Sequence, residues 1–140
     1  MHIREFVIAD YDAVYDLWEG MPGIGLSQAD DRCEIGKYLA RNPGMSFVAV
    51  EGDGIVGAVL CGHDGRRGYI HHMAVDPAFR GRGAGRALFR AASDALAREG
   101  IAKCHLFVKK GNALAESFWT ALGWQRRDDL LMFSYDIEGC

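Results

Sequence analysis

The segment best suited to bind a ligand is a glycine- and arginine-rich stretch at residues 80–86. It consists of Arg80, Gly81, Arg82, Gly83, Ala84, Gly85 and Arg86. We expect it to join a strand to the first turn of a long helix, where backbone N–H groups lack intrahelical partners and the helix dipole is positive. Glycines let an anion approach that backbone closely, and the arginines add positive charge. The segment is therefore predicted to be a pyrophosphate cradle.

This segment matches neither of two familiar nucleotide-binding patterns. A Walker A loop requires G-x-x-x-x-G-K-[ST], which the chain lacks. The dinucleotide pattern G-x-G-x-x-G fails as well, because counting from Gly81 places Arg86 where the third glycine should be. The alternative interpretation is a solvated glycine turn that only begins a helix.

Two adjacent histidines, His71 and His72, are the candidates for proton transfer, because imidazole titrates close to neutral pH. They fall in a predicted strand at residues 69–75, where neighbouring side chains point to opposite faces. His71 has the parity of Met73 and Val75, so we expect it to face the cleft and His72 to face the other way. The alternative is a strand histidine that is hydrogen-bonded in the core.

The elements that must position these residues are strands and helices in mixed order. Apolar runs bounded by turn residues predict six strands, at residues 2–7, 46–51, 55–61, 69–75, 103–108 and 131–137. Helical periodicity predicts four helices: one from Asp10 to about Glu19, one from Ser27 to Asn42, one from the glycine loop to Gly100, and one over residues 112–122. Residues 46–75 are predicted to form an antiparallel meander. The order β-α-α-β-β-β-α-β-α-β predicts a mixed α/β fold, in a single domain over residues 1–140.

The composition is that of an ordinary globular chain of 140 residues, 49% hydrophobic and 25% charged. A net charge of −3 argues against a nucleic-acid-binding module built on the arginines. No signal peptide or apolar spanning stretch is visible, so no membrane partner is expected. No cysteine pair has CxxC spacing and no third metal ligand has convincing spacing, so we expect reduced thiols, a cytoplasmic location and no metal site. The four cysteines are Cys33, Cys61, Cys104 and Cys140.

Two signatures give the chain a family resemblance. Arg80-x-x-Gly83-x-Gly85 resembles the [QR]-x-x-G-x-[GA] signature of the GCN5-related N-acetyltransferases. Asn112-x-x-Ala115-x-x-Phe118-Trp119-x-x-Leu122-Gly123-Trp124 resembles that family's second signature, N-x-x-A-x-x-[LF]-Y-x-x-x-G-[FW]. The start of the chain is also similar to the family's start, so the resemblance covers nearly the whole sequence.

The resemblance implies a splayed central sheet and acetyl-CoA as co-substrate. By position, backbone groups of Met73 and Val75 would pair with pantetheine in the gap of the sheet. The Met73 N–H would face the thioester carbonyl and stabilise the developing oxyanion. The resemblance assigns the pyrophosphate to residues 80–86 and the pantetheine arm to Asn112. His71 resembles a histidine used by arylalkylamine N-acetyltransferases, which makes it the candidate general base.

Trp119 departs from the family pattern, which usually has a tyrosine that acts as general acid. An indole N–H is not acidic enough for that role, so either another group protonates the CoA thiolate or it leaves unprotonated. The alternative is that Trp119 packs beside the cofactor without a part in the chemistry. Phe107 stands where some relatives carry a glutamate base, so that base is absent. Residues 20–31 correspond to the family's substrate loop.

These inferences predict acetyl transfer from acetyl-CoA to a primary amine, by direct attack within a ternary complex. The acceptor stays open between a small-molecule amine and a protein amino group, and the resemblance allows a homodimer. A non-catalytic acyl-CoA sensor is the alternative, and Trp119 is the feature that favours it. Turnover with a broad panel of amines separates the two.

Overall fold

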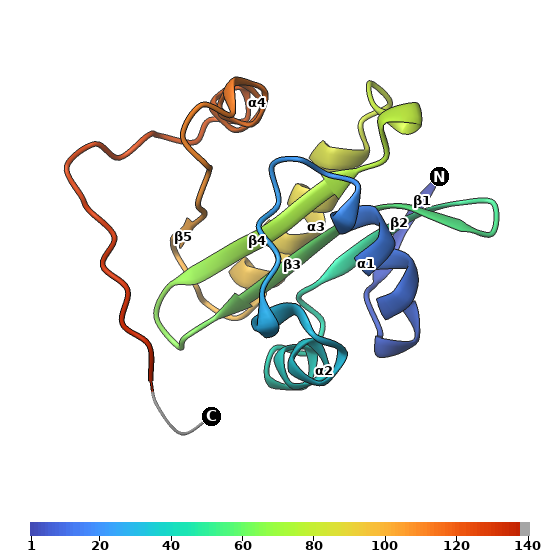
Figure 1. The fold of residues 1–140 in the computed structure, drawn as a ribbon, viewed down its shortest axis with the longest axis horizontal. Helices are drawn as coiled ribbons and strands as arrows, with labels where there is room; N and C mark the ends of the chain where they lie inside the picture. Colours follow the sequence, from blue (N-terminus) through green and yellow to red (C-terminus); the bar gives the residue numbers. More distant parts are fainter. Residues whose placement is uncertain (138–140) are drawn as a thin grey trace. The chain divides into compact units, whose positions relative to one another are not determined.

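The computed structural model describes residues 1–137, so Cys140 lies outside the described residues. The elements follow the order β1, α1, α2, β2, β3, β4, α3, β5 and α4 (Figure 1). The chain forms two compact units, Met1–Lys109 and a second that begins at Lys110, and each is described by itself. The single domain expected over the whole chain stays a prediction.

A five-stranded sheet with the order β1-β2-β3-β4-β5 lies at the centre of the first unit. Its strands are β1 (His2–Glu5), β2 (Phe47–Glu51), β3 (Gly54–His63), β4 (Gly68–Val75) and β5 (Cys104–His105). The first four strands pair antiparallel, and β5 pairs parallel with β4. Only Gly68 and Tyr69 of β4 have partners in β5, so within residues 1–137 the rest of that β4 edge has no neighbouring strand. The predicted meander is confirmed, and the sheet is splayed at this edge.

Helices cover both faces of this sheet (Figure 1). On one face, α1 (Tyr11–Glu19) and α2 (Arg32–Arg41) bury Trp18 and Ile35 against Val48 and Leu60 of the sheet. On the other face lies α3 (Ala84–Arg98), whose Leu88 is fully buried. Burying apolar surface of this kind is worth roughly 25 cal/mol per Å² and holds both layers on the sheet.

Two of the predicted helices begin at Asp10 and Ser27, and these two side chains make their hydrogen bonds within short 3-10 turns that precede the helices. The Asp10 carboxylate accepts a hydrogen bond from the Val7 N–H at 3.0 Å, and the Ser27 Oγ accepts one from the Ala29 N–H at 3.2 Å. The helices α1 and α2 begin just after these turns. The extra turn before α2 contains Asp30, which is buried.

The strand β4 contains a β-bulge at His72 and Met73. The register of β3 against β4 shifts by one residue between Ala58 and Leu60, so β4 has one residue more than the stretch of β3 that it faces. His72 has a φ of 50°, in the left-handed region that residues other than glycine seldom adopt. Side chains on the two sides of the bulge therefore do not follow the simple alternation of a regular strand.

The second unit contains the predicted fourth helix, α4 (Ala113–Ala121). Asn112 caps its N-terminus, and the Asn112 Oδ1 accepts a hydrogen bond from the Ala115 N–H at 3.1 Å. The strand predicted at residues 131–137 is wrong: no strand is formed there, and Phe133 is 89% exposed. A strand requires a hydrogen-bonding partner, and these residues have no ladder partner within the described part of the chain.

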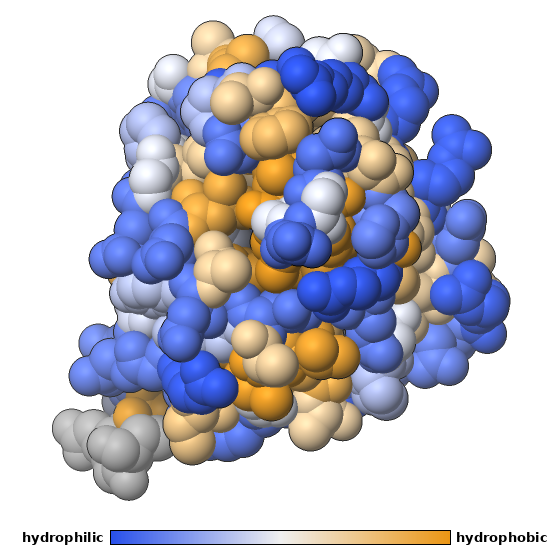
Figure 2. All heavy atoms as spheres, turned by 90° about the vertical axis from the view of Figure 1, so that its right-hand side faces the viewer, coloured by the Kyte–Doolittle hydropathy of each residue, from blue (hydrophilic) through white to orange (hydrophobic). Residues whose placement is uncertain are grey.

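Among residues 1–137, no helix is both long enough and apolar enough to span a bilayer. The same residues contain no group of three His, Cys, Asp or Glu side chains placed to hold a metal ion. Figure 2 shows one face of the surface, on which hydrophobic patches are separated by hydrophilic residues.

Candidate active site

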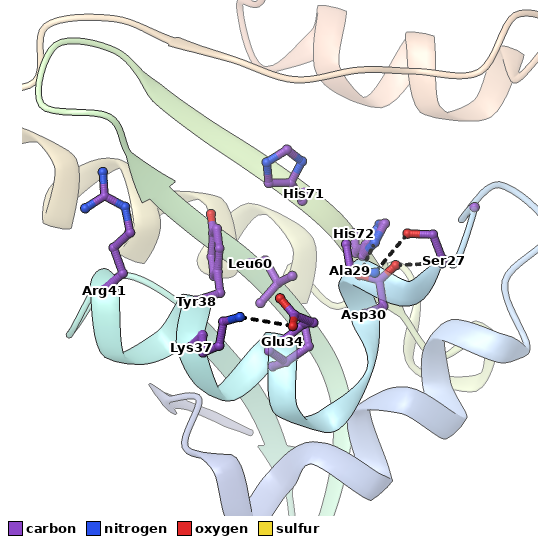
Figure 3. A pocket seen from close by; sticks show the side chains of 12 residues that line it. Ser27, Ala29, Asp30, Glu34, Lys37, Tyr38, Arg41, Leu60, His71 and His72 are labelled. Carbon is purple, nitrogen blue, oxygen red and sulfur yellow. Dashed lines mark hydrogen bonds and ion pairs between the residues drawn. The ribbon is translucent and has the colours of Figure 1, made fainter. Parts of the chain in front are cut away.

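A pocket of about 420 Å³ lies in the first unit, between α2, the turn before it, and strands β3 and β4 (Figure 3). Its polar lining includes a carboxylate, a phenol, a guanidinium and two imidazoles. These groups belong to Asp30, Tyr38, Arg41, His71 and His72. The substrate loop implied by the family resemblance therefore contributes to the same pocket as the predicted strand histidines.

His72 is held at both its ring and its backbone. The ring Nε2 lies 2.9 Å from Asp30 Oδ1, and the other oxygen of Asp30 accepts a hydrogen bond from the Ser27 N–H at 3.0 Å. The Trp18 indole N–H donates to the His72 carbonyl at 3.1 Å, and the Trp18 ring lies edge-on to the imidazole at 5.1 Å. These contacts stabilise a backbone conformation that is otherwise unfavourable, a kind of strain that is common at functional sites.

His71 lies among aromatic rings. Its imidazole is nearly parallel to the Tyr69 ring, with centroids 6.3 Å apart, and is stacked against Phe107 at 6.5 Å. Tyr38 approaches edge-on at 6.3 Å. Within residues 1–137, no hydrogen-bond partner is found for either ring nitrogen of His71, so both are available to a ligand.

The pKa of His71 is lowered from its ordinary value. Burial is the largest cause, and the positive charge of a protonated His72 acts in the same direction, whereas Asp30 opposes them. Lowering the pKa of an imidazole favours its neutral form, which is the form that accepts a proton. His71 is therefore in the state required of a general base at neutral pH.

The expectation that His72 points away from the cleft is wrong. Both His71 and His72 line the pocket, with ring centroids 6.4 Å apart. The physical reason is the bulge at His72 and Met73, which adds one residue and breaks the alternation on which the parity argument depended. The catalytic role of His71 stays a prediction.

One face of α2 forms a polar wall of the pocket. Glu34, Lys37, Tyr38 and Arg41 all line it, and their spacing of three and four residues places them on one side of the helix. Glu34 and Lys37 form an ion pair of 3.1 Å within this face. Ile35 of the same helix also lines the pocket and is buried in the core.

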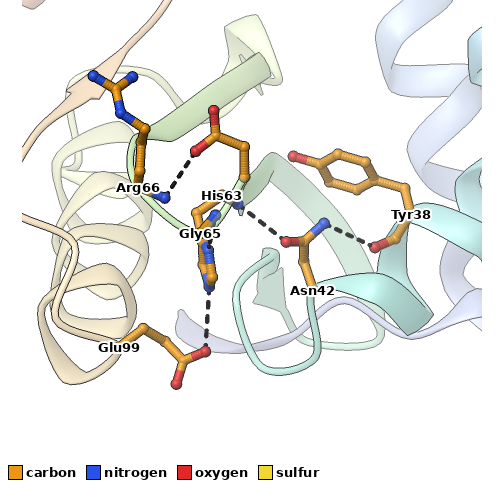
Figure 4. A network of polar contacts seen from close by, with 7 residues as sticks. Tyr38, Asn42, His63, Gly65, Arg66 and Glu99 are labelled. Carbon is orange, nitrogen blue, oxygen red and sulfur yellow. Dashed lines mark hydrogen bonds and ion pairs between the residues drawn. The ribbon is translucent and has the colours of Figure 1, made fainter.

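The C-terminal end of α2 is fixed to the end of β3 (Figure 4). Asn42 Oδ1 accepts a hydrogen bond from the His63 N–H at 3.0 Å, and Asn42 Nδ2 donates to the Tyr38 carbonyl at 3.3 Å. Gly62 allows this close approach, because a Cβ there would lie 2.6 Å from Asn42 and 2.7 Å from the Tyr38 hydroxyl. The last turn of α2 therefore has little freedom to move against the sheet.

The glycine- and arginine-rich segment forms the loop between β4 and α3. Gly81 and Gly83 have φ values of 80° and 82°, which favour glycine, and both face open space. Arg80 donates through Nε to the Val75 carbonyl at 3.3 Å, and the Arg82 guanidinium lies over the Phe79 ring at 5.1 Å. The N–H groups in the first turn of α3 have no intrahelical acceptors. The loop thus has the open, positively polarised backbone that a pyrophosphate requires.

Met73 and Val75 lie on the part of β4 that no strand of the described chain covers on its β5 side. Met73 is in the bulge, and Val75 pairs with Gly57 of β3 on the other side. An extended ligand can therefore reach main-chain groups along this edge, as the predicted pantetheine contacts require. The individual contacts stay predictions.

In the second unit, Trp119 belongs to an aromatic cluster. Its ring lies edge-on to Phe118 at 4.9 Å and to Trp124 at 5.2 Å, and the side chain is 8% exposed. Packing is therefore an observed role of Trp119. The assignments of Asn112 and Trp119 to acetyl-CoA stay predictions.

Sequence reasoning missed Tyr38 and Arg41. For Asp30 it left two interpretations open, a charge at a helix terminus and a contact with the acceptor from the loop at residues 20–31. The spacing of Tyr38 and Arg41 was a usable signal, because residues three apart lie on the same side of a helix. The contact between Asp30 and His72 joins residues far apart in the sequence, so no local sequence pattern predicts it.

Comparison with known proteins gives matches over nearly the whole chain. Residues 11–124 match the model of the acetyltransferase (GNAT) family. An acetyltransferase of Pectobacterium atrosepticum is 34% identical over 138 residues, which cover 99% of this chain and 97% of that protein. An acetyltransferase of Yersinia enterocolitica is 30% identical over 132 residues, covering 94% of this chain and 93% of that protein.

Solved structures share the fold at lower identity. An aminoglycoside 6'-N-acetyltransferase from Acinetobacter haemolyticus has a TM-score of 0.80 at 18% identity, covering 99% of this chain and 100% of that one. The PaiA N-acetyltransferase of Thermoplasma acidophilum, solved with coenzyme A, has a TM-score of 0.77 at 16% identity and covers 91% of each chain.

Proposed function

This chain belongs to the acetyltransferase (GNAT) family, and we propose that it transfers an acetyl group from acetyl-CoA to a primary amine. Membership confirms the resemblance inferred from the two signatures and makes the protein an acyltransferase with acetyl-CoA as its co-substrate. The observation that carries the proposal is the strand β4, which joins the pocket containing His71 to the open glycine loop before α3.

The donor side of the proposal uses the loop at residues 80–86 and the uncovered edge of β4. The N–H groups of the first turn of α3, together with Arg80, Arg82 and Arg86, would hold the pyrophosphate. Open space at Gly81 and Gly83 supports this assignment, because no heavy atom of residues 1–137, apart from the glycine and its two neighbours in the chain, lies within 4 Å of a Cβ built at either position. Met73 and Val75 would hold the pantetheine arm through main-chain hydrogen bonds. The second family signature is the ground for assigning Asn112 and Trp119 to acetyl-CoA as well.

On the acceptor side, the amine nitrogen attacks the thioester carbonyl carbon, and the C–S bond breaks after a tetrahedral intermediate. The Met73 N–H stabilises the oxyanion, and His71 accepts the proton that the amine loses. The lowered pKa of His71 supports that role, because the ring is neutral at neutral pH. The CoA thiolate leaves without protonation by Trp119, since an indole N–H is too weak an acid. The step is direct, with no covalent enzyme intermediate.

We propose a small molecule as the acceptor. The pocket of about 420 Å³ has the volume of a small-molecule site. The aminoglycoside acetyltransferase among the similar structures is named for a small-molecule amine. A protein amino group is the second acceptor class, and a homodimer remains a proposal without a role in the chemistry.

A screen of acetyl-CoA-dependent thiol release across amine classes tests the function, with mass spectrometry to identify the acetylated product. At least one primary amine should be acetylated, and calorimetry should detect acetyl-CoA binding. Binding of acetyl-CoA without turnover of any amine would contradict the enzyme and would favour the non-catalytic sensor.

A further inference from the structure

Two hydrogen-bond donors in the pocket have no partner within residues 1–137. No ion pair or hydrogen bond within that part of the chain engages the Arg41 guanidinium or the Tyr38 hydroxyl, and both residues line the pocket. The neighbouring charges differ in this respect. Glu34 pairs with Lys37, and Asp30 contacts His72.

Tyr38 and Arg41 are three residues apart on α2, so their side chains lie on the same side of the helix, one turn apart. Figure 3 shows both side chains extending from α2 toward the side of the pocket where the His71 ring lies. The turn that carries them is fixed by Asn42 and by the close approach of Gly62. The fixed turn keeps the backbone at both residues in place, although the Arg41 side chain itself is exposed.

The chemistry of this pair matches an anion. A guanidinium has a planar set of N–H donors that fits the two oxygens of a carboxylate. Burial raises the pKa of Tyr38 above its ordinary value, so its phenol stays protonated and donates. Neither group repels a negative charge. The two carboxylates that line the pocket, Asp30 and Glu34, already contact His72 and Lys37.

We propose that Arg41 and Tyr38 form a carboxylate subsite, so that the acceptor is an amine that also carries a carboxylate, such as an amino acid. This inference rests on the proposed function for its choice of an amine. The carboxylate binds at the end of the pocket formed by the last turn of α2, and the amine lies toward His71. Arg41 and Tyr38 determine specificity and take no part in bond making.

Kinetics with matched amines tests the subsite. The pairs are β-alanine with propylamine and leucine with 3-methylbutylamine. Phosphoethanolamine with ethanolamine shows whether a phosphate is preferred to a carboxylate. Arg41→Ala should raise KM for the carboxylated amines by ~10- to 100-fold, the value expected for losing a charged hydrogen-bond pair, and should change KM for propylamine by less than about twofold. Arg41→Lys should recover part of the loss, and Tyr38→Phe should give a smaller increase in KM.

Arg32→Ala is the matched control. Arg32 lies on the same helix but pairs with Asp12 on the surface and does not line the pocket, so its removal should leave every KM unchanged. A preference for the uncharged amines in the wild type, or equal effects of Arg41→Ala on both members of each pair, would overturn the subsite while leaving acetyl transfer intact. A wild-type preference for phosphoethanolamine over β-alanine would overturn the carboxylate assignment.

A binding measurement separates the subsite from turnover. N-acetyl-β-alanine and N-propylacetamide, which differ only in the carboxylate, are titrated into the CoA-saturated protein by calorimetry. The carboxylated compound should bind the wild type more tightly, and Arg41→Ala should abolish the difference. This result supports the subsite even if no amine in the screen turns over, and equal binding of both compounds to the wild type would overturn it.

Discussion

His71 and His72 are neighbours in the chain, yet their surroundings suit them to different tasks. His72 has one ring nitrogen against Asp30 and its carbonyl against the Trp18 indole, so its orientation is fixed. His71 lies among aromatic rings, and no hydrogen bond within the described residues occupies its ring nitrogens. A residue that must accept a proton from a substrate needs a free nitrogen, which is why we assign that task to His71.

Replacing His71 with alanine should lower kcat by ~10²-fold while acetyl-CoA affinity stays nearly unchanged. The deficit should shrink as pH rises, because the amine then loses its proton to water. The pKa of His71 is lowered by burial, so the wild-type rate should fall only below about pH 6.5, as His71 becomes protonated.

Steady-state kinetics from acid to alkaline pH measures this effect. His63→Gln is the control, because His63 contacts Glu99 and lies outside the pocket. A loss that is the same at every pH would show that His71 is not the base.

Trp119 should prove to be a packing residue. Trp119→Phe keeps an aromatic ring within the cluster with Phe118 and Trp124, so most activity should remain. Trp119→Ala should cost about 3–5 kcal/mol of unfolding free energy, the usual loss for a buried large ring, and should weaken acetyl-CoA binding. Denaturant unfolding and steady-state kinetics check both variants. A folded Trp119→Phe enzyme with normal acetyl-CoA affinity and a hundredfold lower kcat would contradict this view, since it would give the indole N–H a chemical role.

Among the elements, the loop between β4 and α3 depends most on glycine. Gly83 has a φ of 82° and faces open space, so valine there would be strained and would project into the proposed phosphate site. Gly83→Val should therefore abolish acetyl-CoA binding, which we expect at micromolar affinity in the wild type, about −7 to −8 kcal/mol.

Gly44→Val is the control for backbone strain alone. Gly44 has a φ of 74° and also faces open space, but it lies in the turn after α2. Calorimetry should show normal acetyl-CoA binding for Gly44→Val. Equal affinity of Gly83→Val and the wild type would refute the cradle.

The elements also show what the sequence can and cannot predict. The helices and the meander at residues 46–75 follow from local periodicity and glycine turns, and the structure confirms them. The bulge at His72 depends on how two strands pair, so the strand's own residues do not reveal it. The apolar run at residues 131–137 suits a strand, but local pattern cannot show whether a partner is present. The donor side of the site was predicted from two signatures. The spacing of Tyr38 and Arg41 indicates that they share one side of a helix, but only the fold shows that they line the same pocket as Asp30.

At the scale of the whole molecule, one ion pair links the first strand to the layer of helices. Arg4 of β1 contacts both carboxylate oxygens of Asp10, at 2.8 and 2.9 Å, and Asp10 is 8% exposed. The Arg4 hydrogen bond is the largest cause that lowers the pKa of Asp10. Because the pKa is lower in the folded state, the pair stabilises the fold above the ordinary carboxylate pKa, and that contribution is lost as pH falls through the folded-state pKa.

Asp10→Asn should lower the free energy of unfolding at pH 7 by about 1–2 kcal/mol, since the Arg4 side chain is partly exposed and its interaction is screened by solvent. The difference from the wild type should narrow below about pH 4, where the carboxyl of the unfolded chain takes up a proton, and should be smallest once pH has fallen through the lowered pKa of folded Asp10. Urea unfolding at several pH values measures it. Asp12→Asn should have little effect, because Asp12 is 89% exposed and lies 3.4 Å from Arg32. If both substitutions lowered the free energy of unfolding equally, the cause would be the change in net charge and not the contact between Arg4 and Asp10.

The extra residue in β4 also affects how this chain is compared with others. The bulge changes which face of the sheet alternate side chains occupy, so the pattern before His72 differs from the pattern after it. In a sequence alignment, a relative without the bulge would therefore need a one-residue gap at this point for equivalent side chains to be matched. An alignment without that gap would match pocket residues on one side of the bulge and residues of the opposite sheet face on the other. Deleting His72 would create the regular strand that the sequence pattern suggests. An insertion or deletion of one residue at this point during evolution would therefore change which side chains line the pocket. The glycine loop between β4 and α3 would keep its sequence.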